Sequence, residues 1–179
     1  MLDSLAVPTP LPGVDVDVTV RRAAEEDIDA IVGFLGADPV SSGRGDGNVE
    51  DNGPLYRAAF HAILADPGND LVVLDETESG EMIGTLQLTL IPGMTRRGTT
   101  RLLIEGVHLS GEHHSRGLGT AFMRWVTDVA APELGAGLVQ LTSDSARVDA
   151  HRFYERLGFV GSHVGFKYPV PERGTAPGT

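Results

Sequence analysis

The hydrophobic pattern of the N-terminal third predicts one strand followed by two helices. Branched apolar and polar residues alternate over residues 16–20, which is typical of a half-buried strand. Acidic residues at 25–27 then occupy the first turn of a helix with one apolar face. That face is formed by Ile28, Ile31, Val32 and Leu35. We expect a second helix over residues 55–64.

The middle of the chain predicts three strands. Residues 71–74 and 83–90, rich in Val, Leu and Thr, have the composition of strands and are separated by a polar stretch, so they indicate an antiparallel hairpin. Residues 91–100 contain Pro92, Gly93 and Gly98 and predict a turn. A third strand should follow over residues 101–109.

The last third predicts a helix, a short buried strand and a second helix. Apolar residues recur at helical spacing from Leu118 to Val129, and residues 138–142 form a short apolar run. Good N-cap residues at 143–145 precede a helix that contains Tyr154, and Gly158 lies where a left-handed C-terminal cap is expected. Residues 159–166, continuing toward 170, should form the closing strand or strand pair. This order predicts an α+β fold with a mixed, mostly antiparallel central sheet flanked by helices in a single domain.

Three segments lack any such period. Residues 1–14 contain three prolines and are expected to be a flexible extension, as are residues 171–179, which leaves one domain over 15–170. Residues 36–53 include five glycines and Pro39 and predict a long loop. That loop is either a functional lid that selects the substrate, together with the helix after it, or plain disorder.

Composition narrows the possible functions. The chain has 179 residues, of which 41% are hydrophobic, and no cysteine, so a disulfide framework, a thiol nucleophile and thiolate zinc sites are excluded. No apolar run approaches the ~20 residues of a membrane span, and no signal peptide is recognisable, so we expect a cytoplasmic protein without membrane contact. A net charge of −11 argues against nucleic-acid binding. It mildly favours a cationic acceptor, although solvated surface explains most of it.

A glycine-containing loop between the third strand and the next helix is the candidate functional element. Gly117 and Gly119 precede or open that helix, whose first N–H groups are unpaired and carry the positive end of the helix dipole. A phosphate or pyrophosphate is the natural ligand there. A P-loop is excluded because the chain's only lysine is Lys167, and a dinucleotide fingerprint lacks its third glycine.

Two motifs in this region resemble those of the GNAT superfamily of acyl-CoA-dependent N-acyltransferases. The segment from His114 to Gly119 is similar to the family's pyrophosphate loop, Gln/Arg-x-x-Gly-x-Gly/Ala, with His114 replacing the usual first residue. The segment from Ala150 to Phe159 is similar to Ala-x-x-Phe/Leu-Tyr-x-x-x-Gly-Phe. The resemblance covers roughly residues 16–168 and implies a GNAT-like fold. It also implies acetyl transfer from acetyl-CoA to a primary amine by direct attack in a ternary complex.

The resemblance also implies which residues bind the cosubstrate. The diphosphate would lie on the loop and the first helical turn, formed by His114, Ser115, Arg116, Gly117, Leu118, Gly119 and Thr120. The pantetheine arm would run along the main chain of Val107, His108 and Leu109 like an added strand. Arg147 occupies a position where many members have an Asn that contacts the cofactor. It is either a phosphate ligand or a surface residue.

Two residues are candidates for proton transfer. Glu105 lies in phase with Leu103, Val107 and Leu109, so we expect it among apolar side chains, where burial raises a carboxyl pKa toward the range of a general base. A structural pairing with an arginine at the cleft edge is equally compatible. Tyr154 resembles the family's general acid, which protonates the sulfur of CoA, whereas a tyrosine on the apolar face of a helix is otherwise most often a core residue.

Other functions remain open at this point. A non-catalytic acyl-CoA-binding regulatory or interaction module would have the glycine loop but would catalyse no reaction. An enzyme of another fold that binds a nucleotide phosphate would also explain the glycine loop, but not the second motif. The histidines at 108, 113, 114 and 151 complete no recognisable metal-ligand spacing, so we expect no metal. The acceptor is expected to be a small-molecule amine or a protein or peptide amine. Homodimers are common in the family.

Overall fold

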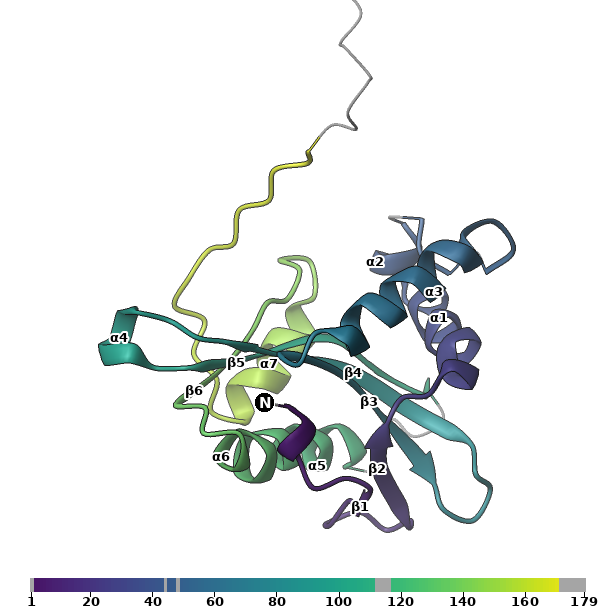
Figure 1. Ribbon diagram of the computed structural model, residues 1–179, viewed down its shortest axis with the longest axis horizontal. Helices are drawn as coiled ribbons and strands as arrows, with labels where there is room; N and C mark the ends of the chain where they lie inside the picture. The colour runs from purple at the N-terminus through teal and green to yellow at the C-terminus, as the bar shows by residue number, and fades with distance from the viewer. Residues whose placement is uncertain (1, 44, 48, 112–116, 171–179) are drawn as a thin grey trace, which may run out of the picture. The chain divides into compact units, whose positions relative to one another are not determined.

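The computed structural model describes residues 2–43, 45–47, 49–111 and 117–170. The chain divides into two compact units, residues 1–141 and residues 142–179, which are taken in turn. The first contains the sheet and most of the helices (Figure 1). The second contains one helix among its described residues, α7 (Val148–Arg156).

The first unit contains a six-stranded sheet in the order β1-β2-β3-β4-β5-β6. Neighbouring strands are antiparallel from β1 to β5, and β6 is parallel to β5. This confirms the mixed, mostly antiparallel sheet and the β3–β4 hairpin. The strands are β1 (Thr9–Pro10), β2 (Val18–Arg22), β3 (Asn69–Glu76), β4 (Met82–Ile91), β5 (Arg101–Leu109) and β6 (Leu138–Leu141).

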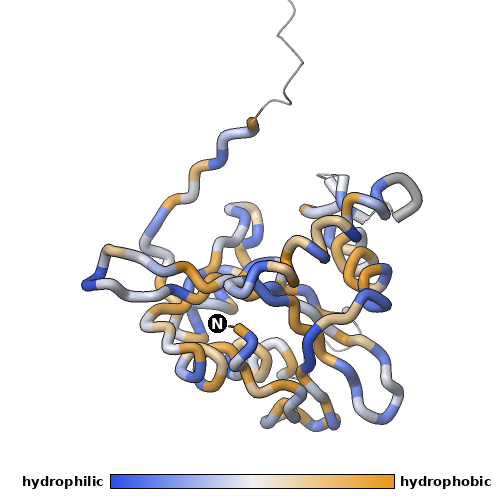
Figure 2. The backbone as a smooth tube through the Cα atoms, viewed as in Figure 1, coloured by the Kyte–Doolittle hydropathy of each residue, from blue (hydrophilic) through white to orange (hydrophobic). Residues whose placement is uncertain are grey.

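Helices cover both faces of this sheet (Figure 1). On one face α1 (Ile28–Ala37) and α3 (Val49–Ala65) pack on the sheet through a buried cluster of Ala23, Ile28, Val32, Phe60 and Val73. On the other face α5 (Leu118–Trp125) continues into a π-helical turn, η4 (Val126–Ala130), and then α6 (Ala131–Glu133). Figure 2 shows hydrophobic residues along the helices on both sides. The amphipathic helices predicted at 28–35 and from Leu118 are confirmed.

The expectation of a flexible extension over residues 1–14 is wrong for its described part. A 3-10 turn at Leu2–Ser4 begins this segment, and Leu2, Leu5 and Leu11 are almost completely buried. Arg22 Nη2 donates to the carbonyl of Leu2 at 2.7 Å. The prolines are compatible with this arrangement because β1 is an edge strand, where a missing N–H breaks no central ladder.

The prediction of one long loop over residues 36–53 is also wrong, because helices occupy part of this range. Asp38 caps a short helix, α2 (Pro39–Ser42), by accepting from the backbone N–H of Ser41 at 2.8 Å. Helix α3 then begins at Val49 instead of residue 55. Pro54 lies in the second turn of α3, where it removes a single backbone donor.

The second unit departs from the expected closing strand. Residues 159–170 form no strand, and the side chains of Val160, Val164, Phe166, Tyr168 and Val170 are more than three-quarters exposed. The alternation of Val164, Phe166, Tyr168 and Val170 has the period of a strand. An alternating sequence pattern alone does not produce a strand, because the backbone N–H and C=O groups of a strand also need hydrogen-bond partners on a neighbouring strand.

A buried ion-pair cluster fixes the start of α1 against the sheet. Asp27 is 7% exposed and accepts from Arg21 Nη1 at 2.6 Å, from Arg21 Nη2 at 2.9 Å and from the N–H of Ala24 at 2.7 Å. Arg21 also pairs with Asp75 on β3. Burial acts to raise the pKa of Asp27, but the hydrogen bonds from Arg21 and Ala24 and the charge of Arg21 outweigh it, so this pKa is lowered.

Asp27→Asn should therefore destabilise the fold near neutral pH by roughly 1–3 kcal/mol, because an amide cannot accept all three bonds. Since the folded-state pKa of Asp27 is lowered, its contribution is present above the unfolded value of about 3.9 and is lost as pH falls through the folded value. Urea unfolding from pH 7 to pH 2 measures both effects. Asp29→Asn, at an exposed position of the same helix, is the control. Equal stability of the two variants at neutral pH would contradict this account.

Candidate active site

Strand β5 carries one extra residue where it passes β4. Thr85 lies opposite His108 and Gln87 lies opposite Glu105, so two steps along β4 match three along β5. Gly106 within this interval has φ = +57°, a left-handed conformation that glycine adopts without penalty. These features define a β-bulge, which bends the strand and interrupts its ladder.

The bulge corrects the predicted face of Glu105. Because the extra residue reverses the alternation, Glu105 shares its face with Leu103 and His108, whereas Leu109 lies opposite Gly84 on the other face. The Glu105 side chain is exposed, so the expected placement among apolar side chains is wrong. Gly106 was the sequence signal for this bulge, since an isolated glycine in a strand often marks one.

The end of β5 is held tightly against β4. A Cβ added at Gly84 would lie 2.6 Å from Leu109 Cδ2 and 3.1 Å from the carbonyl oxygen of His108, so a larger residue would require β5 or the Leu109 side chain to shift. The ladder ends with the N–H of Ser110 donating to Ile83 at 2.9 Å. Val107, His108 and Leu109 are half-buried on this segment. The strand predicted to receive the pantetheine arm is thus fixed in position.

Helix α5 begins without a side-chain cap. Its N-cap, Gly117, is exposed and left-handed (φ = +76°), and its side-chain-free position provides no cap. The first recorded main-chain bond of the helix joins the N–H of Ala121 to the carbonyl of Gly117 at 2.9 Å. Leu118 is buried and anchors the turn, while Thr120 is exposed.

The N–H groups of Leu118, Gly119 and Thr120 precede the first intrahelical bond, so they are the donors a diphosphate would use. A Cβ added at Gly117 would meet no atom within 4 Å among the described residues. This open geometry fits the predicted anion site. The predicted ligands His114, Ser115 and Arg116 lie outside the described residues.

In the second unit, the local fold of α7 holds Tyr154. Gly158 has φ = +97°, its N–H donates to Glu155, and the N–H of Phe159 donates to Tyr154, each at 3.0 Å. This pair of bonds is the Schellman motif, and it confirms the predicted left-handed cap at Gly158. The rings of Tyr154 and Phe159 meet edge to face at 5.9 Å. The motif that suggested a functional tyrosine is therefore also a helix-ending device.

Electrostatics keep the Tyr154 phenol protonated. Burial raises the pKa of Tyr154, and the positive charge of Arg147 offsets only part of that rise. Arg147 is the N-cap residue of α7, so the helix begins later than the caps expected at residues 143–145. The structure thus places the predicted Arg147 within electrostatic reach of the predicted Tyr154, and the tyrosine can act as a proton donor at neutral pH.

The described residues contain neither a metal-binding cluster nor a membrane-spanning helix. No three His, Cys, Asp or Glu side chains gather there as metal ligands would. None of the helices described has the length and apolarity needed to cross a membrane.

Comparisons with known proteins concern the family and the fold of this chain. A family model described as the acetyltransferase (GNAT) family matches residues 42–159. The structure also matches that of a transcriptional regulator from Bacillus halodurans C-125, with 37% identity and a TM-score of 0.78. The match covers 86% of this chain and 99% of that chain.

Two more distant structures share the fold. Glucosamine-6-phosphate N-acetyltransferase from Arabidopsis thaliana is 19% identical, with a TM-score of 0.64, and the match covers 86% of this chain and 99% of that chain. AAC(6')-Iy, in complex with the bisubstrate analog CoA-S-monomethyl-acetylneamine, is 13% identical, with a TM-score of 0.65. That match covers 86% of this chain and 98% of the other.

Gly117→Ala tests the anion site. The new side chain strains a left-handed residue by about 1–2 kcal/mol and displaces the amides that follow, so the Kd for CoA measured by calorimetry should rise at least about tenfold. Gly135→Ala is a matched control, because Gly135 also has positive φ and open space around its Cβ position but lies beyond the C-terminal end of α6. It should lose similar stability and keep its CoA affinity. Equal affinity losses in the two variants would exclude a specific role for Gly117.

Proposed function

Since the chain belongs to the acetyltransferase (GNAT) family, we propose that it transfers the acetyl group of acetyl-CoA to a primary amine by direct attack in a ternary complex. The observation that carries this proposal is the start of α5, where the left-handed Gly117 supplies no side-chain cap to the main-chain donors that follow it. A bare helix start of this kind suits a diphosphate.

Cosubstrate binding divides between main chain and side chains. The diphosphate binds the amides of Leu118, Gly119 and Thr120, and His114, Ser115 and Arg116 complete the loop. Arg147 contributes a positive charge to a phosphate. The pantetheine amides pair with the main chain of β5 from Val107 to Leu109, on the edge that β6 pairs only from Arg101 to Ile104 among the described residues.

The reaction forms one bond and breaks another. The neutral amine nitrogen attacks the acetyl carbonyl carbon, and a backbone N–H near the end of β5 stabilises the oxyanion. The tetrahedral intermediate collapses with cleavage of the carbon–sulfur bond, and the electron pair stays on sulfur. The attacking nitrogen loses one proton to a base, and the thiolate gains one from Tyr154. The products are the acetamide and CoA.

Loss of the ammonium proton is the harder proton transfer, because an alkyl amine has a pKa of about 10 and a thiol one of about 8.5. Glu105 is the proposed base. Its exposure favours action through a water molecule, since an exposed carboxylate keeps its water contacts. Tyr154 is the proposed acid, supported by its raised pKa and by the ring contact that fixes it.

Tyr154→Phe should lower kcat by at least about tenfold and at most about 10⁴-fold, because the ring contact survives and the transferable proton is lost. The Kd for acetyl-CoA should stay nearly unchanged. Steady-state kinetics and calorimetry on the same preparations measure the two quantities. Tyr168→Phe, at a largely exposed tyrosine of the same unit, is the control and should retain full activity. Equal rates for both variants and the wild type would remove Tyr154 from the mechanism.

The second candidate function is a non-catalytic acyl-CoA-binding regulatory or interaction module. It is favoured by the 37% identity with a protein described as a transcriptional regulator. A pure binding module needs neither Glu105 nor Tyr154. Thiol release from acetyl-CoA across a panel of amines separates the two functions: tight acetyl-CoA binding without release for any amine would favour the module.

A further inference from the structure

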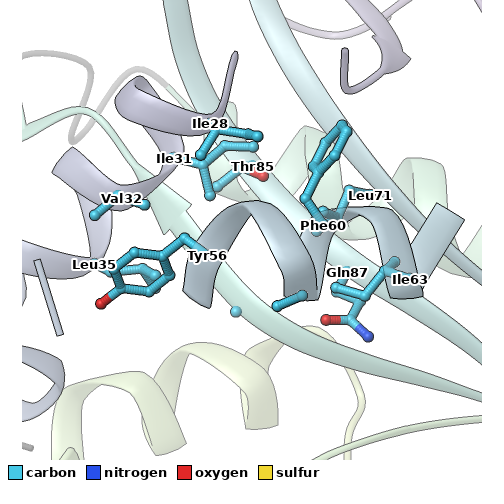
Figure 3. Close-up of a pocket in the computed structure, with 12 residues that line it drawn as sticks. Ile28, Ile31, Val32, Leu35, Tyr56, Phe60, Ile63, Leu71, Thr85 and Gln87 are labelled. Atoms are coloured by element: carbon cyan, nitrogen blue, oxygen red, sulfur yellow. The ribbon is translucent and has the colours of Figure 1, made fainter. Parts of the chain in front are cut away.

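A cavity of about 190 Å³ lies between helices α1 and α3 and the middle of the sheet (Figure 3). It belongs wholly to the first unit. The helices contribute aliphatic and aromatic side chains, and the sheet contributes the floor, next to the bulge at Gly106. The lining residues are Ile28, Ile31, Val32, Leu35, Tyr56, Ala59, Phe60, Ile63, Leu71, Thr85, Gln87 and Gly106.

No residue in this lining carries a charge, and its polar groups are mostly engaged. The hydroxyl of Thr85 donates to the carbonyl of Val72 at 3.1 Å. The hydroxyl of Tyr56 accepts from the N–H of Gly47 at 3.1 Å and donates to Asp46 at 3.4 Å. The interior therefore offers apolar contact and few hydrogen bonds.

The polar end of the cavity is at Gln87. Its Nε2 donates to Asn69 Oδ1 at 3.3 Å, and Asn69 Oδ1 also accepts from Thr89 at 2.6 Å. This contact turns the amide nitrogen toward Asn69, and no donor to Gln87 Oε1 is recorded among the described residues. Glu105 lies opposite Gln87 across the strand pair. The amide of Gln87 thus marks the end of the cavity beside the bulge, and Glu105 lies next to it in the register of the two strands, outside the lining.

The volume sets the size of the ligand. An apolar cavity of about 150 Å³ is large enough to hold benzene. The cavity under α3 is somewhat larger, so it holds a single ring with a short linker. A hydroxylated sugar or a polyamine would leave buried polar groups unpaired there, which lowers affinity.

We propose that this cavity selects the acceptor: a primary amine whose carbon body is apolar and about the size of one ring. The body packs between α1, α3 and the sheet, and the amine nitrogen points to Gln87 Oε1 and Glu105. The inference rests on the proposed acetyl transfer for its chemistry, but binding of the amine is measurable without turnover.

An amine panel tests this selection. Benzylamine and 2-phenylethylamine represent the proposed class, and ethanolamine, glucosamine and spermidine represent small polar, sugar and polycationic amines. Calorimetric Kd and, with acetyl-CoA, kcat/KM should favour the ring-bearing amines by at least about tenfold. Preference for a polar amine would overturn the inference and leave acetyl transfer intact. Binding of ring-bearing amines without any transfer would support the cavity and contradict the proposed function.

Ala59→Trp, with Ala58→Trp as its matched control, locates the binding site. Both alanines are exposed neighbours on α3, but only Ala59 lines the cavity. Ala59→Trp should raise the Kd for 2-phenylethylamine at least about tenfold and leave that for CoA unchanged, whereas Ala58→Trp should change neither appreciably. Equal effects of the two substitutions would overturn the proposed site.

Gln87→Leu provides a second variant that leaves the helices unaltered. It should weaken 2-phenylethylamine binding and leave binding of toluene, which has the ring but no amine, unchanged or stronger. Unaltered amine affinity in Gln87→Leu would show that the nitrogen does not lie at this end of the cavity.

Discussion

Glycine at position 106 allows β5 to carry an extra residue opposite β4, and much of the proposed site depends on that local irregularity. A regular strand would keep Glu105 in phase with Val107 and Leu109. The bulge instead places Glu105 and His108 on the face of Gln87 and Thr85, which faces α1 and α3. It also brings the end of β5 close to Gly84. One backbone conformation thus affects both the strand end that we propose for the pantetheine arm and the polar end of the proposed acceptor cavity.

The proposed anion site and the proposed acid, Tyr154, both depend on a glycine at the end of a helix. At Gly117 a left-handed residue starts α5 and leaves its first amides without a side-chain cap, which suits an anion. At Gly158 a left-handed residue ends α7 and brings Phe159 onto the ring of Tyr154. The glycines and the aromatic pair of the two motifs therefore have structural causes as well as proposed chemical ones.

Sequence reasoning succeeded where a single element determines its own conformation. The apolar face of α1, the β3–β4 hairpin and the cap at Gly158 follow from local spacing. It failed where residues far away in the sequence determine the conformation of a segment. Arg22 and the sheet order the proline-containing N-terminus, and α3 begins before a Gly-Pro pair that usually precedes a helix. Residues 164–170 have strand period, but no ladder forms there. For the proposed site, motif spacing predicted Gly117 and Tyr154, whereas Gln87 and the cavity required the register of β4 on β5.

A crystal structure of the protein with CoA tests the central claim most directly, because it reports on the helix start, the strand end and the tyrosine together. The account predicts diphosphate oxygens within about 3 Å of the main-chain nitrogens of Leu118, Gly119 and Thr120, and the CoA sulfur within hydrogen-bonding reach of the Tyr154 hydroxyl. A diphosphate bound elsewhere, or a sulfur remote from Tyr154, would contradict it.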